Sequence, residues 1–216
     1  MLPWKNIDTV LLDMDGTLLD LHFDNFFWQE YLPGHFAQVN NLSLQQSQDF
    51  LFERFAQVQG TLNWYCLDFW SDQLALDIAA LKIEVQHLIK YRPNAESFLQ
   101  KLNAHGKQAI LVTNAHPKSL DIKLSQTNLG MHLNQTYSSH QFRLPKEDPK
   151  FWGALQQLVP FDHNTTILFD DSHAVLESAK AFGIAHLRAI EKPDSKGACI
   201  AHPEFTAVID FEDIGL

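Results

Sequence analysis

Short apolar runs alternate with helical patterns along most of the chain. The strongest runs are TVLLDMD (9–15), QAILVTN (108–114) and TTILFDD (165–171), and weaker ones are IAHLRAI (184–190) and FTAVID (205–210). Continuous apolar runs are typical of strands buried on both faces, as in a parallel sheet covered by helices. These five segments therefore predict the strands of the core.

Helices are predicted between the strands. Asn94 is placed to cap a helix in AESFLQKLNAHG (95–106), whose apolar residues recur three and four positions apart before Gly106. The segment SHAVLESAKAFG (172–183) has the same spacing and also ends at a glycine. Strands that alternate with helices indicate βαβ units. We therefore predict an α/β fold with a doubly wound, Rossmann-like parallel sheet.

The region from residue 20 to residue 88 breaks this alternation. It shows helical periodicity in DNFFWQEYL, LQQSQDFLFERFAQV and LDFWSDQLALDIAALKIEVQHLIK, and no convincing strand pattern. The predicted domains are a core of residues 1–19 and 89–216 and a small helical lobe of residues 20–88, inserted after the first strand. The chain re-enters the core near Arg92–Pro93, because the residue before a proline avoids the helical conformation.

Composition narrows the class of protein. A chain of 216 residues can bury one substantial core and a smaller lobe, and a net charge of −10 disfavours a nucleic-acid polymer as partner. Cys66 and Cys199 fit no metal or redox spacing, which favours a reducing compartment. MLPWKNIDTV has no signal-peptide pattern, and no apolar stretch approaches the roughly 20 residues that span a bilayer. We expect a cytoplasmic protein without a membrane partner, either a monomer or a homodimer.

Polar residues end each of the three strongest apolar runs. They are Asp13 and Asp15, Thr113 and Asn114, and Asp170 and Asp171. In open α/β sheets, ligands bind at the carboxyl ends of the strands. Carboxylates gathered there repel one another unless a divalent cation lies among them, and oxygen ligands together with a phosphate select Mg²⁺. The sequence therefore predicts a magnesium site that can accept a small anionic ligand.

Four segments carry a family resemblance. DMDGT, VTNA, PKEDPKFW and FDDS occur in the order and spacing of the four motifs of haloacid dehalogenase (HAD) superfamily phosphohydrolases, and the match spans nearly the whole core. The resemblance implies hydrolysis of a phosphomonoester through an aspartyl-phosphate, with Mg²⁺ as the cofactor. It also implies that the inserted lobe is a C1-type cap, which closes over the site and selects the leaving group of the substrate.

The resemblance also assigns catalytic roles. Asp13 is the implied nucleophile, which attacks phosphorus. Asp15 is the implied general acid toward the leaving oxygen and then the base toward water. A dehalogenase needs no proton donor at that position, so Asp15 favours phosphoryl chemistry. Lys146 is implied to neutralise charge on the nucleophile and the transferring group, and Lys150 is the alternative lysine.

Phosphate and metal contacts follow from the same motifs. Thr113, Asn114 and Lys146 are implied to bind phosphate, and Gly16 lets the chain turn sharply beside them. The implied metal ligands are Asp13, the backbone carbonyl of Asp15, Asp171, and Asp170 acting through water or as an orienting group. Helix capping is the alternative role for Thr113, Asn114 and Asp170. His116 in NAHPKS lies near the predicted site, where capping or solvation is the alternative to catalysis.

A more specific similarity concerns the substrate. The segments LLDMDGTLLDLHFDNFFWQEYLP, TLNWYCLDFWSDQLALDI and TNAHP are similar to bacterial GMP/IMP 5′-nucleotidases of this superfamily, in lobe and core alike. This similarity implies a purine nucleoside 5′-monophosphate as the small-molecule substrate. The candidate contacts in the lobe are Asp24, which is placed to meet a sugar hydroxyl, Arg54, Trp64 and Tyr65. The aromatic residues suit stacking on a base and equally an ordinary helical core.

Other functions remain open at this stage. A phosphatase for a small sugar phosphate or for phosphoglycolate would use the same motifs. A phospho-accepting regulatory module, resembling a response-regulator receiver, also combines an acidic cluster, a threonine and a lysine on a parallel sheet. A module that only binds nucleotides is the third alternative. Asp15 and the helical insertion oppose the receiver, and the complete set of catalytic positions opposes the binding module.

Overall fold

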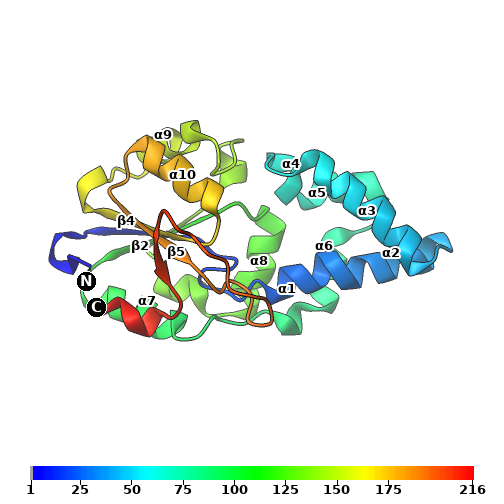
Figure 1. Cartoon of the computed structure of the whole chain (residues 1–216), viewed down its shortest axis with the longest axis horizontal. Helices are drawn as coiled ribbons and strands as arrows, with labels where there is room; N and C mark the ends of the chain where they lie inside the picture. The colour runs from blue at the N-terminus through cyan, green and yellow to red at the C-terminus, as the bar shows by residue number, and fades with distance from the viewer. Residues whose placement is uncertain (1) are drawn as a thin grey trace.

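Six parallel strands form one sheet in the computed structural model, which describes residues 2–216 (Figure 1). The strands are β1 (Thr9–Leu12), β2 (Gln108–Thr113), β3 (Gln135–Ser138), β4 (Thr166–Asp170), β5 (His186–Ile190) and β6 (Thr206–Val208). Their order is β3-β2-β1-β4-β5-β6, and each neighbouring pair is parallel. The five strands predicted from apolar runs are confirmed. The sequence pattern misses β3, because this edge strand, QTYS, contains no apolar run.

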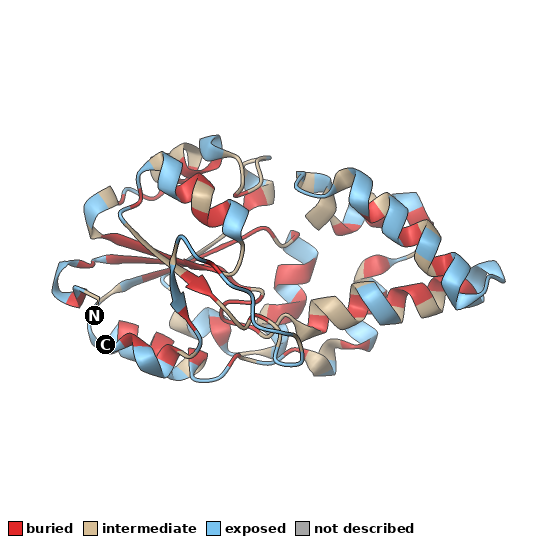
Figure 2. Cartoon of the chain, in the orientation of Figure 1, coloured by how far each residue is buried: buried red, intermediate tan, exposed pale blue. Residues whose placement is uncertain are grey.

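Helices cover both faces of the sheet. They are α7 (Ala95–Ala104), α8 (Pro117–Gln126), α9 (Pro149–Leu158) and α10 (His173–Phe182). Val10 and Leu12 of β1 belong to the buried cluster that contains Phe98 of α7. Leu11, which points the other way, belongs to a second cluster with Trp152 of α9. Figure 2 shows the central strands buried between these layers, and β1, β2 and β4 are buried along nearly their whole length. The prediction of a doubly wound α/β sheet is therefore confirmed.

The two predicted helix boundaries differ in outcome. α10 ends at Gly183 with a left-handed φ of 106°, as the glycine predicts. α7 begins directly after Asn94, but the Asn94 side chain does not cap it. This residue has a φ of 57°, and its amide donates a hydrogen bond to Asp210 instead. The predicted side-chain cap was therefore wrong.

The helices between β1 and α7 form a lobe beside the sheet (Figure 1). Its helices are α1 (His22–Phe26), α2 (Leu32–Asn40), α3 (Leu44–Val58), α4 (Leu62–Tyr65), α5 (Leu67–Leu74) and α6 (Ile78–Glu84). A π-helical turn over Phe27–Tyr31 joins α1 to α2, next to Pro33, which lacks the N–H that an α-helix requires. Aromatic side chains fill the lobe, with Phe55 edge-on to both Trp28 and Trp70.

The two segments that join the lobe to the core lie side by side. Leu19 forms an antiparallel bridge with Tyr91, and the Asp20 N–H donates to the carbonyl of Lys90 at 2.8 Å. Arg92 follows this junction and is buried. Its guanidinium donates to three backbone carbonyls of the core, those of Thr17, Lys192 and Ile209. The lobe therefore leaves and re-enters the core at one fixed place.

Within residues 2–216, no helix combines the length and the apolar character needed to cross a membrane.

Candidate active site

The carboxyl ends of three neighbouring strands build the site. β1 lies between β2 and β4 in the sheet. Asp13 directly follows β1, Thr113 ends β2 and Asp170 ends β4. The three groups predicted from separate parts of the sequence therefore meet at one edge of the sheet, facing the helical lobe.

Lys146 lies at the centre of this acidic group and is buried. Its ammonium donates to Asp13 Oδ1 at 2.5 Å, to Asp170 Oδ2 at 2.7 Å and to the carbonyl of Val112 at 3.1 Å. Burial raises the pKa of Asp13 to about 6, against the opposing charge of Lys146. Burial also acts to lower the pKa of Lys146, but the charges of Asp13 and Asp170 outweigh it and raise that pKa. Lys150, the alternative lysine, is exposed in the first turn of α9.

A group of three carboxylates fits a divalent cation. Asp13, Asp170 and Asp171 each place one oxygen within 4.8 Å of the others. Among residues 2–216, Asp13 Oδ2 is buried without a hydrogen-bond partner. Burial, followed by the charges of Asp13 and Asp170, raises the pKa of Asp171 well above its usual range. Three carboxylates around Lys146 carry an excess of two negative charges when ionised, which a hard divalent ion such as Mg²⁺ offsets.

The roles of the two adjacent aspartates differ. Both oxygens of Asp170 are engaged, one by Lys146 and the other by the backbone N–H of Ser172 at 2.9 Å. The hydroxyl of Ser172 caps α10 by accepting a hydrogen bond from the Val175 N–H. Both residues line the cavity described below, but Asp170 is buried whereas Asp171 is only half-buried. This arrangement supports Asp170 as the orienting residue and Asp171 as the direct ligand.

Gly16 makes the close approach around Asp171 possible. It has a φ of +86°, a conformation that side-chain-bearing residues rarely adopt. A Cβ atom at this position would lie 2.5 Å from Asp171 Oδ2 and 2.9 Å from the Cβ of Pro193. The glycine therefore allows the chain after Asp15 to turn directly against the carboxylate of Asp171.

A second charged group surrounds Asp15 and was not predicted from the sequence. Lys123 of α8 is buried and forms ion pairs with Asp15 Oδ1 at 2.6 Å and with Asp24 Oδ2 at 2.7 Å. Lys82 of α6, also buried, binds the other oxygen of Asp24 at 2.7 Å. Two carboxylates and two ammonium groups balance here, so this group has no net charge to attract a metal.

The surroundings shift the pKa values of Asp15 and Asp24 in opposite directions. Burial raises the pKa of Asp15 to about 6, although Lys123 opposes the shift. For Asp24, burial acts in the same direction but the charges of Lys123 and Lys82 prevail, and they lower its pKa to about 2. Both Asp24 oxygens are held by lysines, and Asp24 also lines the cavity described below, so its predicted contact with a sugar hydroxyl stays a prediction. Asp24 joins the lobe to the core electrostatically.

A hydrogen-bond chain runs from the lobe to Lys146. The Tyr65 hydroxyl donates to Glu147 Oε1 at 2.5 Å, and the Asn114 amide donates to Glu147 Oε2 at 2.9 Å. Asn114 Oδ1 in turn accepts from the backbone N–H of Lys146 at 2.9 Å. Burial, together with the charge of Glu147, raises the pKa of Tyr65, so the phenol stays neutral. Asn114 therefore positions Lys146 and also lines the cavity described below, and its predicted contact with phosphate stays a prediction.

A cavity of about 640 Å³ connects these groups with the lobe. The residues at its charged end are Asp13, Asp15, Thr113, Lys146, Asp170 and Asp171. Its other end is aromatic, and the residues there are Trp28, Phe52, Phe55, Trp64, Tyr65 and Trp70. Trp64 and Tyr65 thus line the cavity, and their contact with a substrate stays a prediction. Arg54 is absent from the cavity lining formed by residues 2–216 and stacks on Phe50 at 3.4 Å, so the structure does not bring it to the cavity.

Thr113 and His116, the remaining polar candidates, also line the cavity. The Thr113 hydroxyl accepts a hydrogen bond from the Ala115 N–H at 3.0 Å. His116 lines the cavity and stands at the N-terminus of α8, where Nδ1 accepts from the Lys118 N–H at 3.4 Å. This contact is the capping role that the sequence left open. Burial lowers the pKa of His116, so its ring is neutral.

Comparison with known proteins identifies the family. A family model of haloacid dehalogenase-like hydrolases matches residues 7–183. GMP/IMP nucleotidase YrfG of Escherichia coli (strain K12) is 45% identical over 194 residues, which cover 90% of this chain and 87% of that protein.

Two solved structures share the fold at low identity. A HAD phosphatase from Thermococcus onnurineus has a TM-score of 0.80 and 17% identity, with 95% of each chain covered. An L-2-haloacid dehalogenase from Xanthobacter autotrophicus has a TM-score of 0.63 and 16% identity, with 96% of each chain covered. The chain belongs to the haloacid dehalogenase-like hydrolase family.

Proposed function

We propose that this phosphatase is a Mg²⁺-dependent 5′-nucleotidase that acts on purine nucleoside monophosphates such as GMP and IMP. One observation carries the proposal: a single cavity runs from the carboxylates around Lys146 to an aromatic wall in the lobe. The charged end of the cavity suits a phosphate, and the aromatic end suits a flat base. The amide side chains of Gln29 and Gln59 also line the cavity, and an amide can pair with the edge of a 6-oxopurine. The identity shared with a GMP/IMP nucleotidase points to the same substrate class.

The proposed reaction has two steps that share two aspartates. Asp13 attacks phosphorus, and the bond to the leaving oxygen breaks as Asp15 transfers its proton to that oxygen. Water then attacks the aspartyl-phosphate, Asp15 takes the proton from this water, and the bond between phosphorus and Asp13 breaks. A pKa of about 6 suits Asp15 to both giving and taking a proton near neutral pH. Lys146 holds the Asp13 carboxylate in place and offsets the charge that develops on the phosphoryl group.

Asp13 and Asp171 are the side chains that would hold Mg²⁺, with Asp170 orienting Lys146. When bound, Mg²⁺ polarises the phosphoryl oxygens and offsets the negative charge of the site. The helical lobe, residues 20–88, acts in this proposal as the cap that covers the substrate and excludes water. A cytoplasmic location belongs to the same proposal, and the free thiols of Cys66 and Cys199 agree with a reducing compartment.

Gly16 provides a test of the metal and phosphate end of the cavity. We expect Gly16→Ala to lower kcat/KM about 100-fold, because a displacement of about 1 Å in a catalytic group has an effect of that size. The strained φ should also reduce the free energy of unfolding by about 1–3 kcal/mol. Steady-state kinetics and urea denaturation measure the two effects. Gly34→Ala is the matched control, because a Cβ at Gly34, inside α2, meets no atom within 4 Å. Wild-type kcat/KM in Gly16→Ala would contradict this account.

A substrate panel tests the proposed specificity. We expect kcat/KM for GMP and IMP to exceed that for glucose 6-phosphate and phosphoglycolate by about tenfold or more, since stacking of a base on aromatic side chains contributes about 1–3 kcal/mol. Trp64→Ala should lower kcat/KM for GMP and leave that for phosphoglycolate unchanged. Phosphate release is measured with AMP and UMP as further substrates, with and without Mg²⁺.

The panel separates the alternatives. A preference for sugar phosphates or phosphoglycolate would keep the phosphatase mechanism and overturn the nucleotidase proposal. Activity that is equal with and without Mg²⁺ would overturn the metal assignment. The receiver and the binding module are disfavoured by the family match over residues 7–183.

A further inference from the structure

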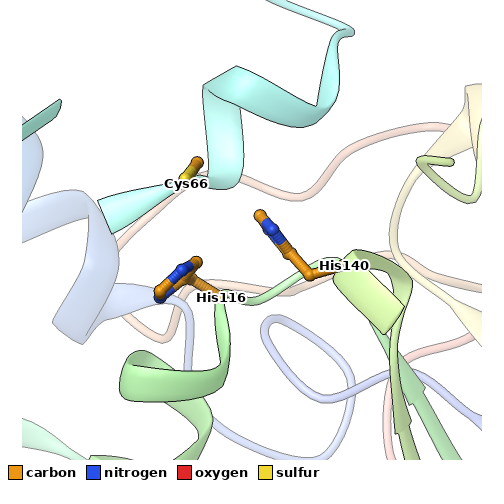
Figure 3. Close-up of side chains that lie close together, drawn as sticks. All are labelled: Cys66, His116 and His140. Carbon is orange, nitrogen blue, oxygen red and sulfur yellow. The ribbon is translucent and has the colours of Figure 1, made fainter. Parts of the chain in front are cut away.

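Three potential metal ligands meet where the lobe contacts the core, outside the carboxylate site. Cys66 lies between α4 and α5 in the lobe, His116 precedes α8, and His140 lies in a short 3₁₀ turn after β3 (Figure 3). One ligand atom from each lies within 4.8 Å of the others. The two imidazole rings are perpendicular to each other, with their centres 4.9 Å apart.

The three side chains have ligand atoms to offer. His140 Nε2 is buried and has no hydrogen-bond partner among residues 2–216. The Cys66 thiol is free and accepts only a long contact of 3.4 Å from the Phe69 N–H within the described chain. His116 Nε2 faces Asp68 at 3.6 Å; because Nδ1 accepts from the Lys118 N–H, Nε2 carries the proton of the neutral ring, and metal binding at Nε2 requires the other tautomer and the loss of this 3.4 Å contact. Burial lowers the pKa of His140 to about 4, so this ring is neutral, as that of His116 is. Neutral imidazole is the form that binds metal ions.

We propose that Cys66, His116 and His140 form a second metal site, for a borderline transition-metal ion such as Zn²⁺, that fastens the lobe to the core. One thiolate and two imidazoles match the ligand preference of Zn²⁺, whereas Mg²⁺ takes oxygen ligands. In a tetrahedral zinc site the ligand atoms lie roughly 3.3–3.6 Å apart. Small side-chain rotations therefore bring the three atoms, now within 4.8 Å, to that spacing. Water completes the fourth position.

The position of the site gives it a consequence for turnover. Cys66 is the neighbour of Tyr65, and His116 follows Asn114 by two residues. Tyr65 and Asn114 are the two ends of the contact through Glu147 that joins the lobe to the core. A metal ion at Cys66, His116 and His140 strengthens this contact and opposes the opening of the cavity. Since lobe opening and product release limit many enzymes of this design, bound Zn²⁺ lowers kcat.

Cobalt spectroscopy tests binding directly. Co²⁺ is added to the protein in excess Mg²⁺, which keeps the oxygen site occupied. We expect one equivalent of Co²⁺ to produce a thiolate-to-cobalt charge-transfer band and the intense visible bands of tetrahedral cobalt. Cys66→Ser should abolish the charge-transfer band, and Cys199→Ser should retain it. His140→Ala should weaken binding at least about tenfold, the scale of losses seen around metal sites.

The cysteine variants are matched. Serine is a good residue at the start of a helix, so Cys66→Ser keeps the contact to the Phe69 N–H and changes mainly the ligand atom. Cys66 is not among the cavity-lining residues of the described chain, so phosphatase activity in Mg²⁺ alone should be unchanged. Cys199 is exposed and serves as the thiol control.

Two outcomes would overturn the proposal. Absence of the charge-transfer band in the wild-type protein, or its persistence in Cys66→Ser, would exclude Cys66 as a ligand. The kinetic claim is tested by adding Zn²⁺ at saturating Mg²⁺, which should lower kcat several-fold in the wild type and in Cys199→Ser but not in Cys66→Ser. Equal inhibition of all three proteins would place the inhibitory ion at the carboxylates and overturn the fastening of the lobe.

Discussion

Replacement of Asp13 by asparagine is expected to reduce phosphatase turnover by about 10⁴-fold or more, the scale of loss when a catalytic nucleophile is removed. Asparagine keeps the shape of the side chain and cannot form the aspartyl-phosphate. The fold should be retained, because Lys146 keeps its contacts to Asp170 and to the carbonyl of Val112. Removing one of the carboxylates that raise the pKa of Asp171 also relieves repulsion. We therefore expect a Tm equal to or above that of the wild type.

Two measurements complete this test. Acid quenching during turnover should leave phosphate on the wild-type peptide that contains Asp13 and none on the Asp13→Asn variant, as mass spectrometry can show. Asp8→Asn is the matched control, since Asp8 is exposed at the opposite end of β1 and should retain full activity. More than about a tenth of wild-type turnover in Asp13→Asn would contradict a nucleophilic role, because that loss lies far below the expected scale.

Replacement of Lys123 by methionine is expected to lower the free energy of unfolding by about 3–5 kcal/mol, the cost of breaking a buried ion pair and leaving a charge uncompensated. Methionine matches the length of lysine, so little packing is lost. Asp24 keeps Lys82 as a partner, but Asp15 loses the ammonium group with which it forms its ion pair. The pKa of Asp15 should therefore rise further above about 6, so less of it is ionised and able to take a proton from water near neutral pH, which lowers kcat.

Urea denaturation measures the stability, and the pH dependence of kcat reports the displaced pKa. Lys118→Met is the control on the same helix, because Lys118 is exposed and should leave both measurements unchanged. A loss below about 1 kcal/mol in Lys123→Met would show that the lysine contributes no more than a surface ion pair. A pH profile of kcat identical to that of the wild type would show that Lys123 does not affect the pKa of Asp15. Lys123 would then have a purely structural role.

The sequence predicts the sheet well because its strands are buried on both faces. Continuous apolar runs mark β1, β2 and β4, and the polar residues that end them can serve no packing role. The sequence pattern misses β3 because an edge strand needs no apolar run. Asn94 fails as a predicted cap because a short polar side chain can satisfy its hydrogen bonds elsewhere, here with Asp210.

The site is predicted where it depends on strand ends and missed where it depends on helix faces. Lys82 stands four residues after the buried Ile78 and next to the buried Leu81, so it lies on the apolar face of α6. A lysine on an apolar helix face needs a buried partner, so its position in the sequence could have predicted Lys82 as part of a buried ion pair. Its partner Asp24 belongs to α1, and no local pattern joins two helices so distant in sequence. Arg54 is the converse case: the sequence favours it as a cation in an acidic lobe, but in the structure its guanidinium lies on the aromatic face of Phe50 and not in the cavity lining of residues 2–216.

The two segments that join the lobe to the core are paired at Leu19 and Tyr91, and this pairing has a consequence for how such an enzyme can change during evolution. Both ends of the lobe are fixed to each other by backbone contacts, the bridge between these residues and the bond from Asp20 to Lys90. Backbone contacts do not depend on the identity of the side chains. The segment between them can therefore be lengthened, shortened or exchanged without altering the register of the sheet or the position of Asp13. Substrate choice can thus be inherited with the lobe while the bond-breaking residues stay in place, provided that a new lobe keeps the contacts that Asp24 and Tyr65 make to the core.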